Sequence, residues 1–237
     1  MALLVPPGKS LDVSWAGAAV FMSKYSGKDK VARIVQYLLM AARVLWKDRP
    51  ERMAWMNQMF REVMVGRRTF RFFSSVGAIA ALRKGIGGED ALARQLGTVS
   101  KCGMIGFHLI DHVRWLQDLK LLPGSTIDSK NRSFTCFAVA SALTMVVQAR
   151  VWLGKPPRAL SDGKISQVER MAALRKKREA ARRSTVRNFL VFFQCLHIST
   201  WYTGFGQSAI GISGVISSSM DCCDLWPAAA AVAPSKR

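Results

Sequence analysis

KDKVARIVQYLLMAARVLWK, residues 28–47, carries the clearest helical pattern in the chain. Apolar residues recur there at the i, i+3, i+4 and i+7 spacing of one helix face. They are Val31, Ile34, Val35, Leu38, Ala41, Ala42 and Leu45. The opposite face carries the polar residues Arg33, Gln36, Arg43 and Lys47. The stretch therefore predicts an amphipathic helix, which either covers a soluble core or contacts a membrane surface.

A second long helix is expected from Pro50 to Lys84, because proline is favoured at the first position of a helix. One side carries large apolar residues, namely Trp55, Met56, Met59, Val63, Phe70 and Phe73. The other side carries Arg61, Arg68 and Arg71. Aromatic residues opposite arginines are typical of a helix in a lipid interface, where each cation contributes about 1 kcal/mol and each buried apolar side chain about 1.5–3 kcal/mol.

The chain as a whole combines high hydrophobicity with high charge. Its 237 residues are 50% hydrophobic, yet 35 Lys and Arg against 15 Asp and Glu leave a formal charge of +20. A basic excess of this size indicates a polyanionic partner, either nucleic acid or an anionic lipid surface. No recognisable nucleic-acid-reading motif accompanies the charge. We therefore expect an anionic phospholipid membrane as the partner, and no nucleic acid.

Two apolar stretches predict that the second half of the chain anchors it in a membrane. Residues 133–153, with one charge near the end, have the length of about 20 residues that crosses a hydrocarbon core. Residues 188–220 carry no formal charge, and small residues four apart within 204–219 allow helices to approach closely inside a membrane. We expect an all-α chain in which amphipathic helices are followed by one or two membrane-embedded helices.

The expected organisation has four parts. Residues 1–28 form an N-terminal extension with a short helix over 11–24, and residues 29–122 form a basic amphipathic helical region with a glycine-rich break at 85–88. Residues 123–220 hold the membrane-anchoring helices, joined by a basic loop at 155–187. Residues 221–237 are expected to be a flexible tail.

No pattern in the sequence supports catalysis, a metal or a cofactor. The five cysteines show no CxxC spacing, which argues against a zinc cluster and a disulfide framework. His108 and His112 lie four residues apart, as helical zinc ligands can, but their apolar flanks and the lack of a third ligand nearby favour a structural pair. We expect a protein that is not an enzyme and that holds neither metal nor cofactor.

Neither end of the sequence matches a common targeting signal. The apolar run before Pro6 is too short for a secretory signal. The last three residues, Ser235, Lys236 and Arg237, differ from the Ser-Lys-Leu peroxisomal address at the final position.

Four segments, in order, resemble motifs of the peroxin-eleven family of peroxisomal membrane-elongation proteins. SGKDKVARIVQY (residues 26–37) is similar to the opening motif of that family, and GRRTFRF (66–72) resembles its Gly-Arg-Lys-x-Phe-Arg helix. Asp111-His112-Val113-x-Trp115 matches its Asp-His-Val-x-Trp element. GISGVISS (211–218) resembles its final small-residue membrane helix. Together the four segments extend over nearly the whole chain.

The resemblance implies a protein of the peroxisomal membrane, or of a specialised peroxisome such as a glycosome, that promotes elongation, proliferation and fission of the organelle. The basic amphipathic helix of the family inserts into one leaflet, which assigns insertion to residues 66–72 of this chain. The expected membrane-binding set is then Trp55, Met59, Val63, Arg67, Arg68, Phe70, Arg71, Phe72 and Phe73. A homo-oligomer and work with the dynamin-related fission machinery are also implied.

A small-metabolite channel is the alternative function, since pore formation is attributed to some members of the family. Residues 134–153 and 188–220 would line its path. The family is drawn with both termini in the cytosol, which here would put the basic loop in the lumen, against the positive-inside tendency. The number and orientation of the membrane spans are left open by the sequence.

Overall fold

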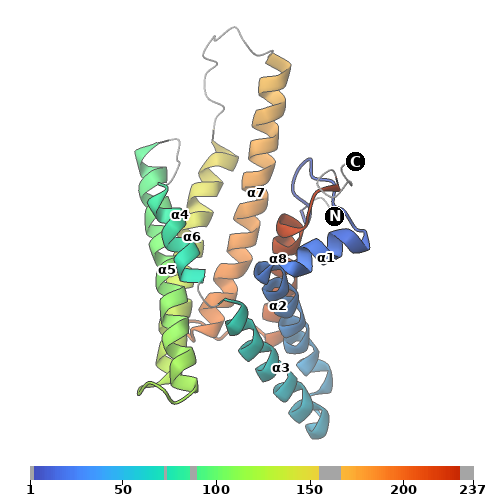
Figure 1. Ribbon diagram of the computed structural model, residues 1–237, viewed down its shortest axis with the longest axis vertical. Helices are drawn as coiled ribbons and strands as arrows, with labels where there is room; N and C mark the ends of the chain where they lie inside the picture. The colour runs from blue at the N-terminus through green and yellow to red at the C-terminus, as the bar shows by residue number, and fades with distance from the viewer. Residues whose placement is uncertain (1–2, 72–73, 86–89, 155–166, 230–237) are drawn as a thin grey trace.

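The computed structural model describes residues 3–71, 74–85, 90–154 and 167–229, which form an all-helical architecture (Figure 1). The expected all-α class is confirmed. The helices are α1 Trp15–Ser23, α2 Tyr25–Ala42, a 3-10 helix Arg43–Trp46, α3 Pro50–Phe70, α4 Ser74–Arg83, α5 Ala91–Asp118, α6 Thr126–Leu153, α7 Gln167–Ile198 and α8 Gln207–Leu225.

Side-chain caps explain where several helices begin. The hydroxyls of Ser14 and Ser125 accept backbone N–H bonds at the starts of α1 and α6, and the Asp90 carboxylate does so at the start of α5. Each cap satisfies one of the N–H groups that have no partner inside the helix. Pro50 occupies the first turn of α3, as expected.

The single helix expected over 50–84 is divided in two. α3 ends at Phe70, where the N–H of Arg71 bonds to the carbonyl of Arg68, and Ser74 then donates to the carbonyl of Arg71. These i to i−3 bonds tighten the backbone into a turn before α4 begins. Apolar spacing continues through the turn, so periodicity alone did not reveal it.

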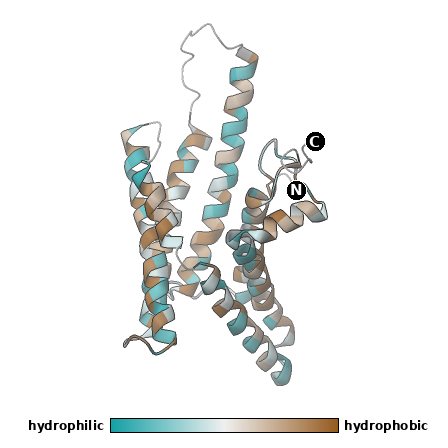
Figure 2. Cartoon of the chain, viewed as in Figure 1, coloured by the Kyte–Doolittle hydropathy of each residue, from teal (hydrophilic) through white to brown (hydrophobic). Residues whose placement is uncertain are grey.

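The uncharged stretch 188–220 is also divided, between α7 and α8. α7 runs from the basic residues 167–187 directly into the uncharged residues 188–198, so the described part of the expected basic loop is helical, and residues 155–166 lie outside the described residues. Hydrophilic residues predominate in the upper part of α7 (Figure 2). The expected flexible tail at 221–237 is wrong at its start, because α8 continues to Leu225.

α7 stands between two groups of helices (Figure 1). On one side it packs against α6, which packs against α5 and, through α5, α4. On the other side it contacts α8, which lies along α2. A small apolar core at the α6–α7 contact contains Ala138, Val191 and Cys195, surrounded by phenylalanines.

α2 is turned with its polar face toward the protein interior. Asp29, Arg33 and Gln36 are buried, whereas Leu38 is 51% exposed and Leu45, just beyond the helix, is 78% exposed. A helix that covers a soluble core would show the reverse. Of the two readings of this helix, the orientation therefore favours contact with an apolar environment outside the protein.

Large apolar side chains are exposed on several helices, among them Val139 and Val146 of α6, Phe189 of α7 and Ile212 of α8.

Candidate functional site

The residues expected to bind membrane are split between the outside and the inside of the fold. Trp55 is 59% exposed and Met59 is 37% exposed on the outer side of α3. Val63 and Phe70 are half-buried. Phe72 and Phe73 lie outside the described residues. The three arginines of the set point inward, so the structure does not bring them together with Trp55 on one exposed face.

Arg67 connects α3 to α2. Its Nε donates to Asp29 at 3.0 Å, and its Nη1 donates to the side-chain oxygen of Gln36. Both partners are buried residues of α2. The inward polar face of α2 therefore provides the acceptors for the first arginine of the GRRTFRF segment.

Arg68 and Arg71 connect the same end of α3 to α5. Arg68 is 6% exposed and forms an ion pair with Asp118 at the end of α5. Arg71 lies 3.1 Å from the carboxylate of Asp111 and 3.9 Å from that of Asp29. We call the cluster of Arg67, Arg68 and Arg71 with Asp29, Asp111 and Asp118 the α3 network.

The charges of the α3 network stabilise one another. Burial alone would raise the pKa of the Asp29 carboxyl, but the charges of Arg67 and Arg71 outweigh burial and hold that pKa below its usual value. Burial lowers the pKa of Arg67 to about 10 despite the opposing charge of Asp29, so the guanidinium stays protonated at neutral pH.

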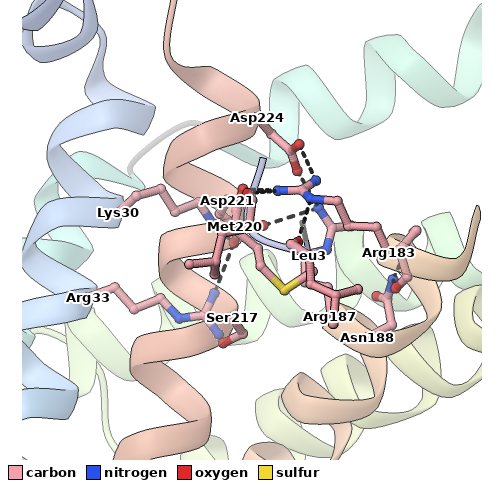
Figure 3. Close-up of polar contacts among 12 residues, drawn as sticks. Leu3, Lys30, Arg33, Arg183, Arg187, Asn188, Ser217, Met220, Asp221 and Asp224 are labelled. Carbon is pink, nitrogen blue, oxygen red and sulfur yellow. Dashed lines mark hydrogen bonds and ion pairs between the residues drawn. The ribbon is translucent and has the colours of Figure 1, made fainter. Parts of the chain in front are cut away.

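A second polar cluster joins α2, α7 and α8 around Asp221 (Figure 3). Asp221 accepts from Lys30 at 2.9 Å, from Arg33 at 3.3 Å and from Arg187 at 3.1 Å. Burial opposes its ionisation, but the charges of Lys30, Arg33 and Arg187 lower the pKa of Asp221 to about 2. Arg33 also donates to Gln194 at 3.1 Å, and Gln194 donates to Ser217.

The same cluster holds the two ends of the described chain together. Arg183 of α7 forms an ion pair with Asp224 and donates to the carbonyl oxygens of Leu3, Leu4 and Met220 (Figure 3). Leu11 also forms an antiparallel β-bridge with Ala228. The N-terminal segment is therefore fixed to the end of α8.

The small residues of GISGVISS bring α8 against α2. A Cβ at Gly214 would lie 2.1 Å from the ring of Tyr37, and one at Gly211 would lie 2.8 Å from Ala41. Ser217 and Ser218 are fully buried on the same helix. The close approach expected for this spacing is thus made within one chain.

An open cleft of about 830 Å³ lies between the two groups of helices. Its walls come from α2, α3, α5, α6 and α7, and the α3 network forms one side. Of the described residues that line it, seven are basic and two are acidic. Aromatic side chains, including Phe60, Phe107 and Phe134, make up much of the remaining wall.

One histidine of the pair, His108, lines this cleft. Nε2 of His112 is 3.4 Å from the carbonyl oxygen of Arg71. Burial, aided by the charge of Arg71, lowers the pKa of His108 to about 4, so its ring is neutral at physiological pH. Within the described residues, no group of three His, Cys, Asp or Glu side chains is arranged to hold a metal ion.

α6 is a candidate membrane span by length and composition. Its most apolar window of 18 residues has a mean hydropathy of 1.6, and only 17% of that window is buried inside the protein. It is the one helix among the described segments that meets both criteria. A buried core helix can pass the same test, but the low buried fraction of α6 argues against that reading.

Sequence reasoning missed the acidic half of both clusters. Asp29 and Asp111 lie inside the quoted motifs, and Asp221 is the first charge after the uncharged stretch. The chain has only 15 acidic residues. An acidic residue on a helix that also carries a row of polar side chains could therefore have indicated a buried ion pair. Gln194, a polar residue inside an apolar stretch, could have indicated a buried hydrogen bond.

Comparison with protein families identifies the family of the chain. The family described as Peroxisomal biogenesis factor 11 (PEX11) matches residues 16–226. This range includes every described helix except the first residue of α1. Comparisons with the curated proteins and with the solved structures found no match.

Proposed function

The chain belongs to the PEX11 family of peroxisomal biogenesis factors, and from this premise we propose that it binds and remodels the peroxisomal membrane through α2 and α3. In this proposal the outward apolar residues of α2 rest in the lipid interface, and the arginines of α3 bind lipid phosphates. Elongation of the organelle before fission would follow from the resulting expansion of one leaflet.

The orientation of α2 is the observation that carries the proposal. Its exposed apolar side chains include Val31, Val35 and Leu38, whereas its charged residues Asp29 and Arg33 are buried. Proteins embedded in lipid keep ionisable groups in the interior of the helix bundle and paired with one another. An apolar exterior over a paired polar interior therefore supports a lipid environment for this helix.

α3 is held by ion pairs more than by apolar burial. Met56 and Arg68 are its fully buried residues. Its exposed side carries Arg52 and Arg61 against Glu51 and Glu62, which leaves no net charge to attract anionic lipid. The positive charge of α3 is instead held in the α3 network, so lipid binding requires access to Arg67, Arg68 and Arg71.

Exchange of partners provides that access. A lipid phosphate can replace the carboxylate of Asp29, Asp111 or Asp118 at little net cost, because both are anions that accept charge-assisted hydrogen bonds. Trp55 and Met59, which are already exposed on the outer side of α3, can then enter the headgroup boundary to a depth of about 5–10 Å. Such an inserted wedge expands one leaflet and favours curvature.

Paired variants of the full chain test this exchange. Asp29→Asn with Asp111→Asn frees Arg67 and Arg71, so we expect tighter binding and more tubulation of anionic liposomes. Arg67→Gln with Arg71→Gln should reduce both. The matched control is Arg52→Gln with Arg61→Gln, which removes the same charge from the exposed side of the same helix.

The two outcomes are measured by liposome co-sedimentation and electron microscopy, with helicity followed by circular dichroism. A larger loss for the exposed pair than for the inner pair would contradict exchange and favour simple adsorption of the outer side of α3. Unchanged binding by the two Asp→Asn substitutions would show that the ion pairs do not limit access.

The small-metabolite channel remains the second candidate. In such a channel, α6 and the uncharged residues of α7 and α8 would line the path. Conductance of the purified chain in planar bilayers, with ion selectivity altered by substitutions in α6, would support it. Homo-oligomer formation and the dynamin-related fission partner likewise stay proposals, testable by cross-linking in the membrane.

A further inference from the structure

Three basic side chains in the cleft carry more positive charge than their surroundings neutralise. Arg68 of α3, Arg114 of α5 and Lys130 of α6 all line this cleft. Arg68 has Asp118 as its partner. Among the described residues, no carboxylate lies within ion-pair distance of Arg114 or Lys130. The acids nearest to Arg114 are Asp111 and Asp118, and these are already paired with Arg71 and Arg68.

Arg114 also has an unused donor. Its Nε is buried and makes no hydrogen bond to any described residue. Burial, together with the charge of Arg68, lowers the pKa of Arg114 to about 10. The guanidinium is thus charged, partly desolvated and incompletely hydrogen-bonded, which is costly unless an acceptor enters the cleft.

Apolar walls lie next to these cations. Phe107 of α5 packs against Phe134 and Phe137 of α6, with ring centroids 5.8 and 4.8 Å apart. Both helices thus present a basic residue and aromatic residues to the same cleft. An amphiphile with an anionic head and an apolar tail matches this arrangement better than a fully hydrated ion does.

We propose that Arg68, Arg114 and Lys130 form a binding site for one phosphate group, with the aromatic wall of the cleft accommodating the apolar part of a lipid that carries it. Arg114 offers planar N–H donors for two phosphate oxygens, and Lys130 offers a compact charge. Arg114 and Lys130 lie on α5 and α6 and take no part in the exchange of partners proposed for α3, whereas Arg68 belongs to both.

The position of Lys130 fits a headgroup. It precedes the uncharged part of α6, which begins at Ser133. Basic residues at the end of an apolar helix lie at the level of lipid phosphates when the helix is in a membrane. A phosphate bound there would satisfy the donors of two helices at once.

The test uses the full chain in maltoside micelles, which contain no phosphate. Dihexanoyl phosphatidic acid and inorganic phosphate are titrated separately by calorimetry, with dihexanoyl phosphatidylcholine as the comparison lipid. We expect saturable binding of phosphatidic acid with one site per chain. Arg114→Gln with Lys130→Gln should raise the dissociation constant at least about tenfold.

The matched control is Lys101→Gln with Arg132→Gln. Both residues are exposed, lie on the same two helices and do not line the cleft, so this variant loses the same total charge. Its dissociation constant should stay within about twofold of the wild-type value. Phosphatidic acid should also raise the melting temperature of the wild type and of the control, but not that of the cleft variant.

The arms of the experiment identify the source of the phosphate. Binding of both probes, with competition between them, assigns the site to phosphate from any source. Binding of phosphatidic acid alone assigns it to a lipid headgroup. Equal losses in the cleft variant and the control, or no saturable binding of either probe, would overturn the proposal. Lys130→Gln alone replaces the double variant if the latter does not fold.

Discussion

Gly214 sets the distance between α8 and α2. Because a Cβ there would lie 2.1 Å from the Tyr37 ring, Gly214→Ala must push the helices apart, and we expect a loss of about 1–3 kcal/mol. Gly66→Ala is the control: nothing lies within 4 Å of that site, so the helix should gain about 0.5–1 kcal/mol. Thermal or chemical denaturation in detergent measures both, and a neutral Gly214→Ala would contradict the close contact.

Asp221 should make the protein sensitive to acid. Its pKa falls from an ordinary 3.8 to about 2 in the folded chain, so its stabilising effect is complete above pH 3.8 and is lost as the pH falls toward 2. Asp221→Asn should cost about 2–5 kcal/mol at neutral pH. The variant should also lose less stability than the wild type between pH 4 and pH 2, which acid titration of the melting temperature checks.

Helical spacing predicted that the arginines and the aromatic residues of α3 lie on different sides, but not the direction in which each side points. Helical spacing correctly separated Trp55 from Arg68 and Arg71. It could not show that the arginines lie inside, because burial of a guanidinium depends on carboxylates supplied by α2 and α5. Asp29 and Asp111 are distant from α3 in the sequence, so their ion pairs with its arginines form only in the folded chain.

The exposed side of α2 gives a prediction for a whole element. Replacing Val35 and Leu38 with Gln should lower binding to liposomes while leaving the fold intact, since the two residues are 38% and 51% exposed. Met56→Ala serves as the contrast on the neighbouring helix: Met56 is buried, so this change should cost about 2–5 kcal/mol. Binding by co-sedimentation and stability by denaturation separate the two effects.

α6 allows a direct test of membrane insertion. Val139 is exposed and lies within the uncharged part of the helix, whereas the exposed Ile127 lies in its first turn. Val139→Asp should impair insertion, because an acid near the middle of a spanning helix costs about 2.5–3.5 kcal/mol. Ile127→Asp should be tolerated. Extraction with alkaline carbonate from cell membranes reports the difference; equal behaviour of both variants would argue against a span.

Most helices could be predicted from periodicity and caps, but their ends could not. The amphipathic pattern of α2 and the length of α6 are local properties of the sequence. The turn at Arg71 and the separation of α7 from α8 interrupt stretches of uniform composition, where spacing gives no signal. α8 continued past the uncharged residues because Asp221 and Asp224 find cations on α2 and α7.

At the scale of the whole molecule, a few acidic residues lie in the interior. Asp29, Asp111 and Asp221 are paired with cations in the interior. Most of the other described acids, such as Glu51, Glu62 and Asp90, are exposed. The positive surface therefore results from the excess of 35 Lys and Arg over 15 Asp and Glu, a formal charge of +20. Such a surface attracts anionic lipid over about 8–10 Å at physiological ionic strength, and added salt weakens the attraction.

Tags on the two ends give a prediction for the intact organelle. The Leu11–Ala228 bridge and the bonds from Arg183 to Leu3 and Leu4 fix the N-terminal segment to the end of α8. Epitopes fused to either end should therefore share the same fate when sealed peroxisomes are treated with protease. Protection of one epitope and digestion of the other would show that the two ends are not held together in the membrane.

The bridge between Leu11 and Ala228 also restricts how the chain can cross a membrane. α6 lies between the two bridged segments along the sequence, so a single passage of α6 through the bilayer would leave Leu11 and Ala228 in different compartments. With the bridge intact, a membrane-spanning α6 would need a second crossing helix to return the chain to the same side. A helical hairpin, which enters and leaves the membrane on the same side, satisfies this requirement in either orientation.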